Sequence, residues 1–170
     1  EPAKPNIVII LTDDLGYGDV SFLNAESKVK TPHMDKLAEE GVWATDAHSP
    51  STVCSPSRYS MLTGRYSWRR KISRLNPWKE SYIDQDRVTL PKILNNKGYF
   101  TACVGKWHLG FLSERPTSPT TAAPAAPTKK SKMGDAGLPV GSRIIGGPIT
   151  RGFDYFWGCS NARTMSGLIE

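Results

Sequence analysis

The chain has 170 residues, of which 38% are hydrophobic and 22% are charged, a composition typical of a globular domain and not of a disordered or fibrous protein. Its 22 Lys and Arg against 16 Asp and Glu give a net charge of +6, which suits anionic ligands, although a solvated basic surface is the simpler interpretation. No apolar run is long enough to cross a membrane. The chain contains no CxxC pair, which argues against a zinc ribbon. We therefore expect a globular chain without a membrane span.

Residues 6–11 (NIVIIL) form the first predicted element, a continuous apolar run typical of a strand buried on both faces. An acidic, glycine-rich stretch follows at residues 12–19. A helix is predicted over residues 31–41, which begin with a capping threonine and a proline and end at a glycine. Residues 42–47 then predict a second strand.

The next predicted helix begins with Ser55 as its cap and ends at Gly64, so that Cys54 comes immediately before it. A further helix is predicted over residues 89–96, and it leads into a strand over residues 99–104. Strands that alternate with capped helices predict an α/β fold with a mainly parallel sheet sandwiched by helices.

The composition changes between residue 113 and about residue 147, where a low-complexity insertion is predicted. Residues 116–128 consist largely of Pro, Ala and Thr, and we expect this stretch to be mobile and dispensable for chemistry. Ordered patterning returns after the insertion, and residues 151–158 (RGFDYFWG) predict aromatic-rich packing.

Two adjacent carboxylates, Asp13 and Asp14, follow the first predicted strand. Ligands of open α/β sheets gather at the carboxyl ends of strands, and neighbouring carboxylates repel each other unless a cation or several donors neutralise them. Oxygen ligands of this kind suit Ca²⁺ or Mg²⁺. A solvated turn explains the dipeptide equally well.

Cys54 lies at the predicted start of a helix, and Arg58 follows one turn later. The positive potential at such a position favours a thiolate and anionic ligands. A buried structural cysteine is the alternative, since this is the usual role of a free cysteine.

Lys106 and His108 follow the strand predicted over residues 99–104. Residues two apart in an extended segment project to the same side, so we expect both side chains to face the crevice that Asp13 and Asp14 border. An ammonium group can hold anionic oxygens, and an imidazole can move a proton near neutral pH. The alternative is a pair that faces water.

Taken together, these residues resemble the sulfatase family of the alkaline phosphatase superfamily. Residues 54–58 (CSPSR) match the C-x-P-S-R motif of that family, and residues 62–65 (LTGR) match its continuation. The chain is also similar to that family at residues 5–19, 105–110 and 151–156. The resemblance implies an alkaline-phosphatase-like fold, of which residues 1–170 are the N-terminal part of the catalytic domain. It also implies that the remainder of that domain supplies further active-site groups.

The resemblance implies a sulfuric ester hydrolase, and we expect a sulfated carbohydrate as its substrate. A formylglycine-generating enzyme would convert Cys54 to Cα-formylglycine, whose hydrated form attacks sulfur. The residues that the resemblance assigns are Asp13, Asp14 and Cys54 for one Ca²⁺ ion, and Cys54, Arg58, Lys106 and His108 for the chemistry.

Two other functions stay open at this point. A phosphonate monoester or phosphodiester hydrolase of the same superfamily can use the same motif, and a catalytically inactive homologue could bind anions without turnover. Residues 69–74 are basic, but no nucleic-acid-binding module accompanies them, so we expect no nucleic-acid partner. Trp68, Trp78 and Trp157 could stack on sugars, although tryptophans are more often packed.

The sequence starts at Glu1 and not at a methionine, which is typical of a processed or trimmed chain, so that removal of a signal peptide stays open. From this we expect a periplasmic or extracellular protein.

Overall fold

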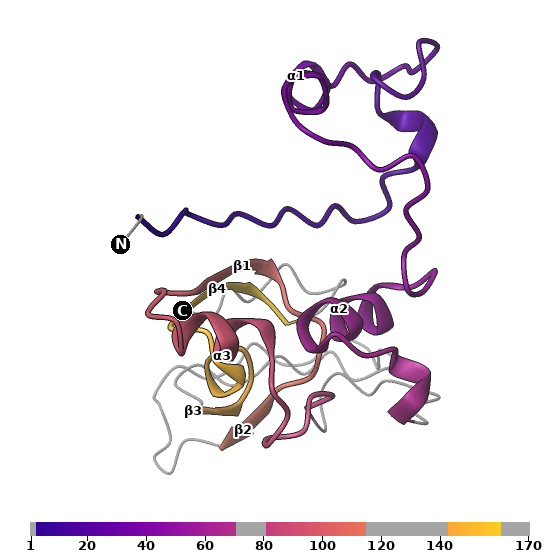
Figure 1. Ribbon diagram of the computed structural model, residues 1–170. Helices are drawn as coiled ribbons and strands as arrows, with labels where there is room; N and C mark the ends of the chain where they lie inside the picture. Colours follow the sequence, from indigo (N-terminus) through magenta and orange to yellow (C-terminus); the bar gives the residue numbers. More distant parts are fainter. Residues whose placement is uncertain (1–2, 71–80, 115–142, 161–170) are drawn as a thin grey trace, which may run out of the picture. The chain divides into compact units, whose positions relative to one another are not determined.

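The computed structural model of the protein describes residues 3–70, 81–114 and 143–160 (Figure 1). The chain divides into two units, Glu1–His48 and Ser49–Glu170. The first unit holds Asp13 and Asp14, and the second holds the other predicted site residues, so the two units are described in turn.

The first unit contains the short 3-10 helix η1 (Tyr17–Asp19) and the helix α1 (Pro32–Glu40). The predicted helix at this position is confirmed, with Thr31 as N-cap, proline in its first turn and Gly41 as C-cap. Asp35 of α1 accepts hydrogen bonds from the Ser21 hydroxyl at 2.6 Å and from the Phe22 amide at 3.0 Å. The bond from Ser21, above all, lowers the pKa of Asp35. These bonds tie α1 to the loop that follows η1.

The strands predicted over residues 6–11 and 42–47 do not form, and both predictions were wrong for this chain. The first run is extended, yet Val8 and Ile10 are each 81% exposed, and Val42 is fully exposed. A buried strand of a parallel sheet needs neighbours whose backbone groups bond to its own. Among the described residues of the first unit no strand supplies such a neighbour.

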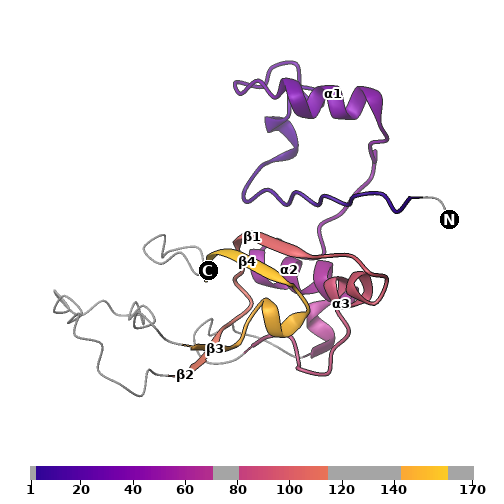
Figure 2. The same cartoon turned by 90° about the vertical axis from the view of Figure 1, so that its left-hand side faces the viewer.

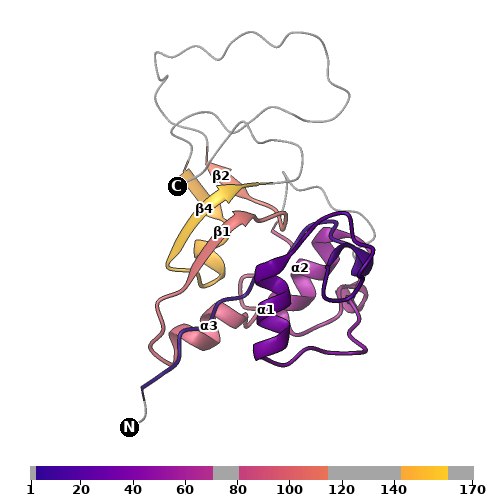
Figure 3. The ribbon, with the colours of Figure 1, turned by 90° about the horizontal axis from the view of Figure 1, so that it is seen from above.

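The second unit contains both sheets. Its elements are α2 (Cys54–Thr63), η2 (Ser67–Arg70), α3 (Leu90–Asn95), β1 (Ala102–Lys106), β2 (Leu112–Glu114), β3 (Arg143–Gly146), η3 (Ile149–Arg151) and β4 (Tyr155–Cys159). Strands β1 and β4 are parallel and run side by side in Figures 2 and 3, with Lys106 opposite Cys159. Strands β2 and β3 form a separate antiparallel pair.

The predicted position of helix α3 is confirmed. Thr89 is its N-cap, and the Thr89 side chain accepts a hydrogen bond from the Lys92 amide. The strand predicted over residues 99–104 is shifted toward the C-terminus, and β1 ends at Lys106. The parallel pairing of β1 with β4 agrees with the predicted parallel sheet.

The core of the second unit packs α2 against the segment that follows β1. Its buried side chains are Tyr59, Leu62, Tyr82, Ile83, Trp107, Leu109, Phe111 and Phe156. Arg151 is also buried, and its Nε donates to the carbonyl of Ile83 at 2.7 Å. Burial lowers the pKa of this guanidinium, and the carboxylate of Asp84 opposes the shift. Because α2 contributes Tyr59 and Leu62 to this core, the helix and its N-terminal residue are held firmly.

Several sequence-based expectations fall beyond the described part of the chain, namely the mobile segment at residues 116–128, most of the insertion at residues 113–147, Lys71, Arg74 and Trp78. Trp68 and Trp157 are described and are 64% and 40% exposed. Over the ranges that the structure describes, every helix is too short or too polar to cross a membrane.

Candidate active site

The start of α2 differs from the prediction by two residues. Val53 has extended backbone and is the N-cap, so Cys54 is the first residue of the helix and Ser55 is not the cap. The hydroxyl of Ser57 donates to the Val53 carbonyl at 3.0 Å and fixes the entry to the first turn. Pro56 is tolerated there because amides of a first helical turn have no partner within the helix. Cys54 therefore lies within the first turn instead of preceding it.

The environment of Cys54 is set by this helix. The thiol is half-buried, and the positive end of the α2 dipole is directed at it. The next side chain, Ser55, is 2% exposed, and its hydroxyl has no hydrogen-bond partner among the residues that the structure describes. The predicted C-terminal end is confirmed, since Gly64 takes the left-handed conformation with φ 64° and its amide donates to Ser60.

His108 contacts Cys54 directly, with its Nδ1 at 3.0 Å from Sγ. Its amide donates to the Ser160 carbonyl at 2.9 Å, and the Trp107 amide donates to the Cys159 carbonyl at 2.9 Å. These two bonds prolong the pairing of β1 with β4 beyond the strand ends. They fix the backbone of His108 beside the start of α2.

The predicted alternation between Lys106 and His108 is wrong in its geometry. Strand β1 ends at Lys106, and His108 has a left-handed backbone with φ 51°. This conformation is uncommon for residues other than glycine, and histidine is among those enriched in it. The turn, and not strand pleating, brings the imidazole to Cys54.

Arg58 joins the same group of residues from the next turn of α2. Its NH1 donates to the carbonyl of Lys106 at 2.6 Å. Burial raises the pKa of Cys103 to about 11, and the positive charge of Arg58 opposes that rise. The structure thus brings together Cys54, Arg58, His108 and the backbone of Lys106, which come from two sequence blocks about 50 residues apart.

Asp13 and Asp14 are exposed in the first unit. Asp14 has a left-handed backbone with φ 58°, which aspartate adopts more readily than most residues. Two carboxylates give the hard oxygen donors that Ca²⁺ prefers. Across the described ranges, no group of three or more His, Cys, Asp or Glu side chains could hold a metal ion. The pair therefore fits the chemistry of Ca²⁺ and provides only part of a ligand set.

Comparison with known proteins places these observations in a family. The family model described as Sulfatase matches residues 5–168. The chain belongs to the sulfatase family. It is 48% identical over 109 residues to the N-acetylgalactosamine-6-O-sulfatase of Bacteroides thetaiotaomicron, and the aligned part covers 64% of this chain and 21% of that protein. It is 32% identical over 165 residues to human steryl-sulfatase, and the aligned part covers 93% of this chain and 24% of that protein.

A solved structure supports the fold of this sulfatase chain. The structure comes from work on the metabolism of multiple glycosaminoglycans by Bacteroides thetaiotaomicron, and it is similar with a TM-score of 0.74 and 34% identity. The match covers 98% of this chain and 31% of that one. The predicted alkaline-phosphatase-like α/β fold is confirmed, and the chain spans roughly a fifth to a third of the length of these relatives.

Sequence reasoning missed the backbone groups that position the candidate site. The carbonyls of Cys159 and Ser160 hold residues 107 and 108, and no side-chain pattern identifies a carbonyl. It also missed the pair Gly105 and Gly158, which face each other across β1 and β4. A Cβ on Gly158 would lie 1.8 Å from the Gly105 oxygen, so only glycine fits. The two glycines in otherwise apolar strands were the available signal.

Proposed function

We propose that this sulfatase hydrolyses sulfate esters of a sulfated carbohydrate, with residue 54 as the nucleophile. The observation that carries the proposal is the contact of Cys54 Sγ with His108 Nδ1 in the first turn of α2. Membership of the sulfatase family supports it.

The residues around Cys54 suit an anionic ester. The N-terminus of α2 and the guanidinium of Arg58 provide positive potential for the sulfate oxygens. Lys106, whose carbonyl Arg58 binds, contributes a further positive charge from the end of β1. Such groups lower the barrier when they stabilise charge that grows on the oxygens in the transition state.

His108 is placed to handle a proton. Its Nδ1 is within hydrogen-bond reach of the side-chain atom of residue 54, which is the geometry required of a general acid or base. The bond from its amide to the Ser160 carbonyl fixes the backbone that carries this ring.

Two further components belong to this proposal. A formylglycine-generating enzyme would convert Cys54 to Cα-formylglycine, and Asp13, Asp14 and the modified residue would hold one Ca²⁺. The hydrated aldehyde supplies one hydroxyl for attack and another for release of sulfate, and Ca²⁺ supplies positive charge. We also propose that residues 1–170 form the N-terminal part of the catalytic domain and that the remainder completes the site.

The carbohydrate substrate is supported by the relatives. One is named as an N-acetylgalactosamine-6-O-sulfatase, and one solved structure comes from work on glycosaminoglycans. The net charge of +6 suits a polyanionic ligand. A periplasmic or extracellular location is part of the proposal, because an enzyme encounters large polysaccharide substrates in those compartments.

Substitution of residue 54 tests the nucleophile in the intact enzyme. In Cys54→Ser, the serine oxygen bonds to sulfur, its proton passes to a base, and the bond from sulfur to the leaving alcohol breaks as that oxygen gains a proton. Serine has no second hydroxyl with which to expel the sulfate, so the adduct should persist. Intact-mass measurement after incubation with an activated aryl sulfate should show the added SO₃. Cys54→Ala should give neither turnover nor adduct, and full activity in it would refute the proposal.

Matched esters separate the alternatives. We expect kcat/KM for a sulfate ester to exceed that for the corresponding phosphonate monoester. The opposite preference would identify a phosphonate hydrolase. Peptide mass spectrometry verifies that residue 54 is the aldehyde. If the enzyme with this aldehyde turns over neither the sulfate ester nor the phosphonate ester, it is an anion-binding homologue.

A further inference from the structure

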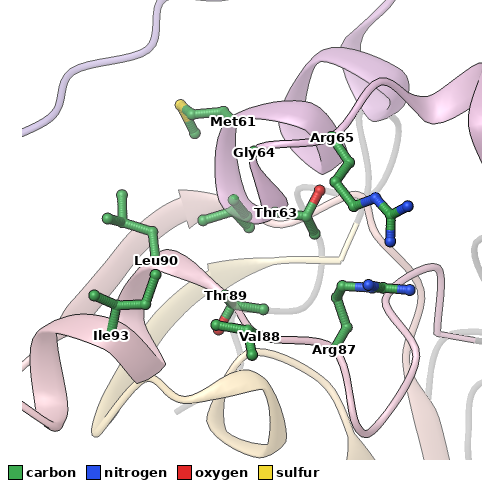
Figure 4. A pocket seen from close by; sticks show the side chains of 10 residues that line it. Met61, Thr63, Gly64, Arg65, Arg87, Val88, Thr89, Leu90 and Ile93 are labelled. Atoms are coloured by element: carbon green, nitrogen blue, oxygen red, sulfur yellow. The ribbon is translucent and has the colours of Figure 1, made fainter.

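A pocket of about 270 Å³ lies in the second unit between the C-terminal end of α2 and the start of α3 (Figure 4). Apolar side chains such as Leu62, Val88 and Ile93 form much of its wall, and Arg65 and Arg87 also line it. In Figure 4 the two arginine side chains come from opposite sides, and both guanidinium groups lie at the same end of the pocket.

Among the described residues, Arg65 and Arg87 have no counter-ion. No acidic residue lines the pocket, and neither guanidinium forms a hydrogen bond or an ion pair within the part of the chain that the structure describes. The Nε of Arg87 is buried without a hydrogen-bond partner. Two like charges at one end of a partly apolar pocket repel each other, and a buried donor without a partner is costly. An anionic group between them would relieve both costs.

An aromatic platform begins at the residue after Arg65. The rings of Tyr66 and Trp68 are stacked, with centroids 5.4 Å apart and planes at 17°. They are 52% and 64% exposed. The guanidinium of Arg69 lies 5.4 Å from the Trp68 ring centroid. Exposed rings next to arginines suit a ligand that has both apolar faces and negative charges, and a sulfated sugar chain has both.

We propose that this pocket and the platform form a second binding site, which holds an anionic polysaccharide. A sulfate or carboxylate of the chain lies between Arg65 and Arg87, and a neighbouring sugar ring lies on Tyr66 and Trp68. Helix α2 has 10 residues and begins at Cys54, so at 1.5 Å per residue its C-terminal end, which lines the pocket, is about 15 Å along the helix axis from Cys54. The bound group is therefore not the ester that reacts, and the site retains a polymer while another of its esters is cleaved. The inference rests on the proposed carbohydrate substrate.

Binding without turnover tests the site directly. The intact enzyme with Cys54→Ala is titrated with a sulfated chondroitin hexasaccharide in a calorimeter, alone and with Arg65→Gln or Arg87→Gln added. We expect each arginine substitution to weaken binding about tenfold, because a charge-assisted contact is lost. Arg65→Lys should recover part of the affinity. The matched control is Lys28→Gln, which removes an exposed charge in the first unit and should change the dissociation constant less than about twofold.

A second measurement uses enzyme with Cys54 intact. Arg65→Gln should lower kcat/KM for the hexasaccharide and leave turnover of a small aryl sulfate unchanged, since the small ester does not reach the second site. If the unsubstituted enzyme cleaves neither ester, the proposed function fails, yet the calorimetric test still decides on the second site.

The outcomes that overturn the inference are specific. Equal hexasaccharide affinity in the Arg65→Gln form and the Lys28→Gln control would do so. A second outcome would also overturn it, namely an Arg65→Gln form that unfolds at a lower temperature but binds the hexasaccharide with unchanged affinity. That result would mean that an acidic segment of the protein itself fills the pocket. Arg65 is exposed and its side chain makes no polar contact in the described residues, so Arg65→Gln is expected to fold even if Arg87→Gln does not.

Discussion

Cys54 and Cys103 belong to the same unit but have different environments. Cys54 begins α2 and contacts His108. Cys103 lies on β1 and packs against the core, where burial raises its pKa to about 11 against the opposing charge of Arg58. The first thiol contacts an imidazole at the start of a helix, and the second is a packing residue that stays protonated at neutral pH.

Alkylation distinguishes these roles. With a pKa of about 11 instead of 9.0, Cys103 has roughly a hundredfold less thiolate near pH 8 than an ordinary cysteine. We expect iodoacetamide to modify Cys103 at least tenfold more slowly in the folded protein than in the urea-unfolded protein, and the folded rate to climb as pH rises toward 11. Peptide mass spectrometry at timed intervals measures both rates. Equal rates in folded and unfolded protein would contradict this assignment.

Strands β1 and β4 depend on a close approach between two glycines. Gly105 and Gly158 are opposite each other, and the pairing continues to His108 through the carbonyls of Cys159 and Ser160. A disturbance of the glycine pair is therefore transmitted to the residue that contacts Cys54.

Gly158→Ala should destabilise the protein by about 2 kcal/mol or more, because the new Cβ would overlap the Gly105 carbonyl and the strands would have to separate. Urea unfolding followed by tryptophan fluorescence measures the loss. Hydrogen exchange of the Trp107 and His108 amides should accelerate as well. Gly64→Ala serves as a control, because its Cβ meets open space and only the strain of its left-handed backbone, about 1 kcal/mol, is added. Similar midpoints for Gly158→Ala and unsubstituted protein would refute this role.

Local signals predicted the helices better than the strands. Helix ends depend on local residues, such as the N-cap positions Thr31 and Thr89 and the C-cap glycines at 41 and 64, so most of them were predicted closely. Residues 6–11 have the composition of a buried strand, but a strand requires hydrogen-bonding partners that the described residues do not supply. The resemblance at residues 54–58 and 105–110 predicted that His108 lies beside residue 54, while the left-handed turn at His108 depends on tertiary bonds that no motif displays.

At the scale of the whole molecule, the proposed site draws on both units. Asp13 and Asp14 belong to Glu1–His48, and the remaining predicted residues belong to Ser49–Glu170. The acidic pair was chosen for its position after an apolar run, and its role as a metal site stays a prediction, because the described residues offer no third ligand beside it.

Calcium binding tests the contribution of the first unit. Asp13→Ala should reduce bound calcium in the intact enzyme from about one ion per molecule to near zero, because one hard oxygen ligand is lost. Elemental analysis and calorimetric titration measure this. Glu26→Ala removes an exposed acid of the same unit and should leave the calcium content unchanged. Equal calcium content in the two variants would refute the assignment.

The bond between His108 and Ser160 has a consequence for the order of events during synthesis. Cys54 leaves the ribosome first, yet its imidazole partner is held by a carbonyl at position 160. At about 5–20 residues per second, translation of the intervening residues takes roughly 5–20 s. During that interval the thiol of Cys54 lacks the contact with His108, and the nascent chain presents it as an accessible side chain. The time available for reactions at Cys54 before folding is therefore set by the distance along the chain to Ser160.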